Sequence, residues 1–122
     1  MTPEDLSRSA SRRSARSGVN RVPYFVVMRE RSSGWNWSLP MRHQKEWDAH
    51  AAFMDAMVDD GFLLAGGPLG DEDSASRVLH VVSAPDTGDI ELRLAQDPWT
   101  HMRLLKTVSI ERWAVLLGGF KG

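Results

Sequence analysis

The sequence contains no cysteine, which removes several kinds of functional site. Disulfide frameworks, catalytic thiolates, zinc ribbons and iron–sulfur clusters all require cysteine side chains. Any chemistry must therefore come from histidines, carboxylates, hydroxyls or a bound molecule. No apolar run approaches the roughly 20 residues that cross a bilayer, and Ser/Arg-rich sequence stands where a secretory signal would have its apolar core. We expect a cytoplasmic protein without a membrane partner.

Positive charge is scarce outside the N-terminal segment. The formal net charge is -1, yet residues 1–22 hold five arginines against two acidic residues, which leaves ten basic and fourteen acidic residues beyond them. Phosphate neutralisation needs clustered Lys and Arg on a folded surface, which this acidic body does not supply. We therefore predict no nucleic-acid partner and interpret the arginine-rich segment as a solubilising extension.

Composition indicates one folded domain between two tails. Hydrophobic residues make up 42% and charged residues 25% of the sequence, which is typical of globular proteins. We divide the chain into a disordered basic tail at 1–22, a domain at 23–118 and a C-terminal tail at 119–122. A domain of about 100 residues can enclose one two-layer core but not two.

Hydrophobic periodicity and turn residues predict a small set of strands and helices. Apolar β-prone runs place strands at 24–28, 62–65, 77–82 and, in two parts, 107–110 and 113–117. Apolar spacings of three and four place a helix at 43–60. The apolar residues of 85–97 fit a strand as well as a helix, and we predict a helix there because it has a cap and a stop. Gly61 is expected to end the first helix in a left-handed cap, whereas Asp86 and Pro98 are expected to cap and stop the second. The apolar residues of the last strand change from even-numbered to odd-numbered positions at Glu111 and Arg112, which predicts a β-bulge there.

The order strand, helix, strand, strand, helix, strand is typical of ferredoxin-like βαββαβ domains. We predict an α+β fold in which a four-stranded antiparallel sheet carries both helices on one face. The expected first, second and last strands have apolar residues at both even and odd positions, and therefore on both faces of the sheet. The face opposite the helices must also be covered. Pairing of two sheets would cover it, and the predicted partner is therefore a second copy of this chain.

Several motifs follow one another at characteristic spacings. The helix motif His50-Ala51-Ala52-Phe53-Met54 is followed by Gly61, by Gly66-Gly67-Pro68 and by Asp97-Pro98-Trp99. Together they resemble the YCII-related (YciI-like) family over residues 24–117. The resemblance implies a dimeric α+β barrel of ferredoxin-like domains, with His50 and Asp97 facing each other over a cleft as the catalytic pair. This chain differs from the family in its longer loop between the first strand and the first helix.

Residues around the expected cleft are candidates for substrate binding. Trp35 and Trp37 lie in the loop expected at 29–41, where two indoles should cover a pocket mouth, the partner subunit or the domain's own core. Gly67 is expected in a tight turn, where the missing side chain leaves room in the cleft. The full set of candidates is Trp35, Trp37, His43, Gly67, Pro68 and Trp99.

The hydrogen-bonding needs of an imidazole also favour a pairing of His50 with Asp97. An imidazole on a core-facing helix ridge needs an acceptor for its second nitrogen, and a carboxylate would fix its tautomer. Such a histidine can take a proton from a carbon or hydroxyl of a substrate. The alternative is a structural hydrogen bond beside the core. We interpret His80, which lies within an apolar strand, as a core or sheet-face residue rather than a ligand.

A metal site would need at least three converging ligands from His43, His50, Asp97 and His101. On a continuous helix His43 and His50 would lie roughly 10 Å apart, too far to share one ion unless the helix begins after His43, and we predict no metal. We also predict no cofactor.

The family resemblance implies a lyase or isomerase, similar to dehydrochlorinases, that acts on a small cyclic or aromatic polar molecule. The alternative is a non-catalytic homodimer that binds a small molecule or serves a structural role. A pocket that holds the His–Asp pair and further polar groups would favour an enzyme, whereas an almost wholly apolar pocket would favour a binding module. A filled interface without a pocket would favour the structural role.

Overall fold

The structure, a computed structural model, describes residues 22–120. Nearly all of the predicted N-terminal tail and the last two residues lie outside this range. The elements are β1 (Tyr24–Arg31), a 3-10 turn (Met41–His43), α1 (Trp47–Asp59), β2 (Leu63–Pro68), β3 (Arg77–Ser83), α2 (Thr87–Leu94), α3 (Pro98–His101) and β4 (Leu105–Trp113). Among the described residues, no helix is long and apolar enough to cross a membrane.

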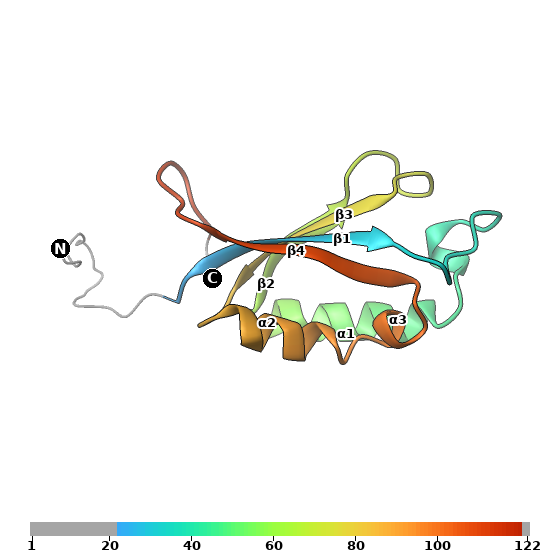
Figure 1. The fold of residues 1–122 in the computed structure, drawn as a ribbon, viewed down its shortest axis with the longest axis horizontal. Helices are drawn as coiled ribbons and strands as arrows, with labels where there is room; N and C mark the ends of the chain where they lie inside the picture. Colours follow the sequence, from blue (N-terminus) through green and yellow to red (C-terminus); the bar gives the residue numbers. More distant parts are fainter. Residues whose placement is uncertain (1–21, 121–122) are drawn as a thin grey trace.

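The strands form one antiparallel sheet, and the helices lie on one of its faces (Figure 1). The strand order is β2-β3-β1-β4, so β1 and β3 are central. Val27 pairs with His80 on β3 and with Ile110 on β4. The predicted α+β, ferredoxin-like arrangement of a four-stranded sheet with two main helices is confirmed.

The first helix begins at Trp47 rather than at residue 43, so that part of the prediction is wrong. The side-chain amide of the buried Gln44 is tied to the preceding loop by three hydrogen bonds. Glu46 then adopts a left-handed conformation with φ 59°. The helix cannot extend back through these residues, and His43 ends the separate 3-10 turn. Gly61, with φ 84°, follows the helix as predicted.

The region predicted as the second helix is divided between α2 and α3. Asp86 caps α2 as predicted, since its side chain accepts a hydrogen bond from the Asp89 backbone N–H at 2.9 Å. The helix ends at Leu94, however, and Pro98 occupies the first turn of α3. A proline fits there because the first N–H of a helix has no partner within the helix. Pro98 therefore starts a helix rather than stopping one.

The last strand is continuous from Leu105 to Trp113 and ends earlier than predicted. Its irregularity lies opposite Met28 and Arg29, whereas Glu111 and Arg112 pair regularly with β1. The bulge predicted at those two residues is therefore wrong. Segment 114–117 lies beyond the strand, and its two leucines are 88% and 91% exposed. Their apolar character does not reflect burial in this chain.

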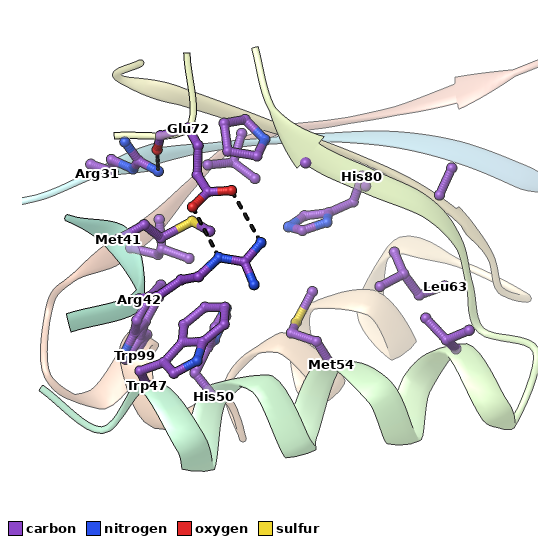
Figure 2. A pocket seen from close by; sticks show the side chains of 17 residues that line it. Arg31, Met41, Arg42, Trp47, His50, Met54, Leu63, Glu72, His80 and Trp99 are labelled. Carbon is purple, nitrogen blue, oxygen red and sulfur yellow. Dashed lines mark hydrogen bonds and ion pairs between the residues drawn. The ribbon is translucent and has the colours of Figure 1, made fainter. Parts of the chain in front are cut away.

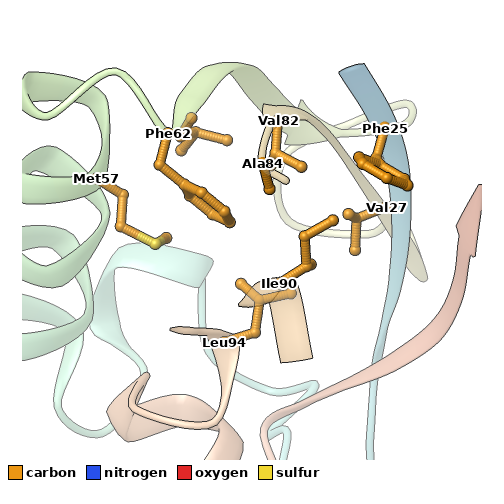
Figure 3. Close-up of a cluster of buried hydrophobic side chains, with 9 residues drawn as sticks. Phe25, Val27, Met57, Phe62, Val82, Ala84, Ile90 and Leu94 are labelled. Carbon is orange, nitrogen blue, oxygen red and sulfur yellow. The ribbon is translucent and has the colours of Figure 1, made fainter. Parts of the chain in front are cut away.

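Two buried apolar clusters occupy the space between the sheet and the helices. The larger one packs α1 and α2 against the central strands (Figure 3) and comprises Phe25, Val27, Met57, Phe62, Leu63, Val82, Ala84, Ile90 and Leu94. The second, called the tryptophan cluster here, comprises Trp35, Val78, Trp99, Leu104 and Leu105. The candidate site adjoins the tryptophan cluster, because Trp99 belongs to both.

The sheet face opposite the helices carries a half-buried apolar row. Val26, Met28 and Leu79 lie on it, because they alternate with residues that point toward the helices. The homodimer predicted from the sequence would cover this row, and it stays a prediction. Light scattering at micromolar concentration should give about twice the chain mass of 13.7 kDa. A mass equal to one chain would contradict the dimer.

Candidate functional site

Asp97 lies at the start of α3 and is completely buried. Its Oδ1 accepts hydrogen bonds from the Trp99 backbone N–H at 2.9 Å and from His50 Nδ1 at 2.8 Å. Its Oδ2 accepts from the Arg29 guanidinium at 2.9 Å. Burial by itself raises the pKa of Asp97, but the hydrogen bonds and charges of His50 and Arg29 outweigh burial and lower it below the usual range. The group is therefore a carboxylate at neutral pH.

Arg29 provides the buried counter-charge for this carboxylate. It belongs to β1, is 0% exposed, and lies on the strand parity that faces the helices. Besides Asp97, its guanidinium donates to Thr100 Oγ1 at 2.6 Å, and this hydroxyl donates in turn to the Leu94 carbonyl at 2.8 Å. The carboxylate is thus held by groups from the sheet and from α3, which fixes its position beside α1.

A ring stack fixes the plane of the His50 imidazole, in addition to the hydrogen bond at its Nδ1. It stacks on the Trp99 indole with ring centroids 3.8 Å apart and an interplanar angle of 5°. The indole is itself anchored, because Trp99 Nε1 donates to the Lys45 carbonyl at 2.8 Å. With Nδ1 bonded to the carboxylate, the proton of a neutral ring sits on Nδ1 and Nε2 carries a lone pair. Among residues 22–120, no hydrogen bond engages Nε2.

A pocket of about 340 Å³ opens beside this pair, between α1 and the β2–β3 side of the sheet (Figure 2). His50, Met54 and Trp47 line it from α1, and an exposed ion pair between Arg42 and Glu72 lies at its rim. The other lining residues are Arg31, Met41, Val58, Leu63, Ala65, Gly66, Gly67, Pro68, Val78, His80, Trp99 and Leu105. The pocket is mostly apolar, with a few polar groups on two sides, as small-molecule sites usually are.

His80 lines the same pocket from the sheet. It is 4% exposed, and neither ring nitrogen has a hydrogen-bond partner among the described residues. Burial, the nearby charge of Arg29 and the proximity of His50 lower the pKa of His80 to about 3, against a smaller opposing effect of Asp97. The imidazole is therefore neutral throughout the physiological pH range.

The buried neutral His80 should make the fold less stable in mild acid. The unfolded chain binds a proton at His80 near the ordinary pKa of about 6.5, whereas the folded value is about 3. The unfolded state therefore binds more protons between these values, and the stability is complete above pH 6.5 and falls as the pH is lowered. From pH 7.5 to pH 5 the free energy of unfolding should drop by about 2 kcal/mol through this group. Urea unfolding measures the drop, and an equal drop in His80→Leu would contradict this assignment.

The structure brings together some of the predicted site residues. His50 and Asp97 are in direct contact, and Gly67, Pro68 and Trp99 line the pocket beside them. Trp99 contributes its stacked indole in addition to its place on the pocket wall.

The other predicted substrate-binding residues lie away from this pocket. Trp35 is buried in the tryptophan cluster, with the Arg31 guanidinium 4.1 Å from its ring centroid and Trp99 edge-on at 5.2 Å. Trp37 is 54% exposed, and His43 borders a different depression. Among residues 22–120, no group of three or more His, Asp or Glu side chains is arranged to hold a metal ion.

The motifs and apolar runs of the sequence indicate neither Arg29 nor Trp47 as a site residue, and they predict His80 only as a core or sheet-face residue. His80 is indeed buried, but it also lines the pocket. A signal for Arg29 exists in the sequence, since it continues the alternation that starts with Phe25 and Val27. Only the tertiary fold shows that Trp47 and His80 meet in one pocket.

Comparison with known proteins identifies a similar fold. A scan of protein-family models finds no match to the sequence, and a search of curated proteins finds none either. Solved structures with a similar fold include 5-chloro-2-hydroxyhydroquinone dehydrochlorinase (TftG) from Burkholderia phenoliruptrix, in complex with 2,5-dihydroxybenzoquinone. The two chains are 18% identical, the match covers 74% of this chain and 93% of that chain, and the TM-score is 0.56. At this identity the similarity shows a common fold.

Proposed function

We propose that this protein is a lyase or isomerase that moves a proton on a small oxygenated ring, with His50 as general base and Asp97 as the residue that orients it. The proposal rests on one observation above all. His50 Nδ1 is bonded at 2.8 Å to a fully buried carboxylate, while the same imidazole borders a pocket of about 340 Å³. Membership of the YCII-related family, which the motifs around this pair resemble, is part of the proposal.

The pocket suits a flat ring that carries oxygen substituents. The indole of Trp47 and the thioether of Met54 offer apolar surface, while His50 offers a lone pair at Nε2. A hydroxyl within hydrogen-bond reach of Nε2 can transfer its proton to the imidazole, and the buried carboxylate stabilises the imidazolium that forms. The proposed reaction uses these side chains and no cofactor.

The name of the structural neighbour points to loss of hydrogen halide from a hydroxylated ring. In such a reaction His50 would take the proton of a ring hydroxyl and deliver a proton to the ring carbon that bears the halogen. Halide would then leave with the bonding electrons while a second hydroxyl loses its proton to solvent water, so that the hydrogen halide departs as halide and a hydrated proton. The net change is loss of one hydrogen halide, and the ring becomes a quinone without an external oxidant.

The test is chloride release from chlorohydroquinone by the purified full chain under anaerobic conditions. We expect chloride and benzoquinone in equal amounts, at a rate clearly above that of buffer alone. Oxygen must be absent because air oxidation also produces quinones from hydroquinones. Binding of the ring without chloride release or ring-proton exchange would contradict the enzyme and would indicate the alternative, a non-catalytic binding module.

A further inference from the structure

One buried histidine of the pocket has no role in the proposed proton transfer. His80 comes from β3 in the sheet layer, whereas His50 comes from α1 in the helix layer, and both line the same pocket (Figure 2). His80 is 4% exposed, and neither of its ring nitrogens has a hydrogen-bond partner among the described residues. Buried polar atoms in native proteins nearly always have partners, because an unpaired one carries its full desolvation penalty. Because this unpaired imidazole lines a pocket, we expect its hydrogen-bond partner to be a molecule that enters the pocket.

We propose that His80 is a ligand-binding residue that selects rings carrying a second oxygen substituent on the side away from His50. The inference rests on the proposed function, because it concerns the same pocket and the same class of ligand. A ring placed between the two layers would meet one imidazole on each side. A phenolic hydroxyl both donates and accepts, so it can pair with an imidazole nitrogen whether or not that nitrogen carries the proton.

The backbone of β2 is shaped around this imidazole. Gly66 pairs with His80 across the β2–β3 ladder, and a Cβ at residue 66 would lie only 2.6 Å from His80 Nδ1. A side chain at this position would therefore displace the ring. At the next residue, Gly67, a Cβ would meet nothing within 4 Å. The space for the imidazole is thus provided by one particular glycine.

The surroundings also keep His80 neutral and close to a positive charge. Arg29 lies near enough to contribute, after burial, to its lowered pKa. A neutral ring keeps one N–H donor and one lone pair, which suits an uncharged hydroxyl or carbonyl better than it would suit a cation. A structural histidine of the core would instead be expected to have a protein partner for at least one nitrogen.

The test compares hydroquinone with para-cresol, which has the same shape but carries a methyl group in place of the second hydroxyl. Isothermal titration of the full chain should show hydroquinone binding at least tenfold more tightly, because a site with unpaired polar groups rejects a ligand that cannot pair with them. In His80→Leu this preference should fall to about threefold or less. His101→Leu, which changes an exposed histidine, should keep the wild-type preference.

A stability measurement separates ligand binding from a structural role. Replacing unpaired buried nitrogens with an apolar side chain of similar size removes a desolvation penalty, so the urea midpoint of His80→Leu should equal or exceed that of the wild type. Gly66→Ala, which keeps His80 but displaces its ring, should also lose the preference. Gly67→Ala serves as its control for the effect of an added methyl group on the urea midpoint.

Each outcome decides between the two proposals. A clearly lowered midpoint in His80→Leu, or an unchanged preference for hydroquinone, would overturn the role of His80 while leaving chloride release as an independent test of the enzyme. If hydroquinone and para-cresol bind the wild type weakly and equally, the proposed class of ligand, a ring with two oxygen substituents, would be wrong. A preference that depends on His80, without any chloride release, would overturn the proposed reaction and leave the ligand site in place.

Discussion

Replacing Asp97 with asparagine should lower the free energy of unfolding by about 3–5 kcal/mol. Asp97 and Arg29 are both 0% exposed, and they are joined by an ion pair of 2.9 Å. The amide keeps the shape of the carboxylate but removes its charge, so the guanidinium would remain buried without a counter-charge. Removal of one partner from a buried pair is costly for this reason. Urea unfolding at neutral pH measures the effect.

The pH dependence of this effect follows from the lowered pKa of Asp97. The folded carboxylate contributes stability that is fully present above the unfolded pKa of about 3.9 and is lost as the pH falls through the lower folded value. The wild type and Asp97→Asn should therefore differ most at neutral pH and converge only in strong acid. The lowered stability expected from His80 in mild acid is a separate effect that both proteins share.

Glu72→Gln is the matched control for Asp97→Asn. It also neutralises a carboxylate bonded to an arginine, but the side chains of Arg42 and Glu72 are 63% and 43% exposed. Exposed ion pairs contribute little to stability, so this variant should unfold at the urea concentration of the wild type. If Asp97→Asn proves equally harmless, the buried guanidinium of Arg29 has another counter-charge, and the electrostatic account of the site is wrong.

The order of the four strands and the two main helices could be predicted because these elements have local signals. Gly61 ends α1 with a positive φ, and Asp86 caps α2 through its own side chain, so these boundaries depend on neighbouring residues alone. The start of α1 could not be predicted in this way. It depends on Gln44, whose side chain bonds to a loop that precedes it by several residues. Periodicity carries no information about such a contact.

The site was predictable only in part for the same reason. His50 and Asp97 are 47 residues apart in sequence, and their pairing was available from a family resemblance rather than from periodicity. The apolar run does not point to Arg29, because it stops at Met28 and predicts that the first strand ends there. The strand in fact continues to Arg31, and its alternation buries Arg29 on the same face as Val27. The buried arginine interrupts the apolar pattern of the strand. It can be buried there because the fold places a carboxylate beside it.

Replacing His50 with asparagine should lower the rate of chloride release from chlorohydroquinone by 10²–10⁴, the range that general-base catalysis usually contributes. The asparagine side chain can place an N–H near the position of Nδ1, so the hydrogen bond to Asp97 can be retained. It has no group at the position of Nε2, which is the nitrogen proposed to receive the substrate proton. Stopped-flow or steady-state measurement of chloride and benzoquinone would give the ratio of rates.

Stability and rate together separate a catalytic His50 from a structural one. The variant loses the stacking of the imidazole on Trp99 at 3.8 Å, and we expect this to lower the free energy of unfolding by no more than about 2 kcal/mol. The His50→Asn variant should then remain folded in the assay while its rate of chloride release falls. His101→Asn makes the same substitution at an exposed histidine and should keep the wild-type rate. If His50→Asn releases chloride within threefold of the wild type, Nε2 is not the base. If it unfolds in the assay, the stack of the imidazole on Trp99 has a structural role.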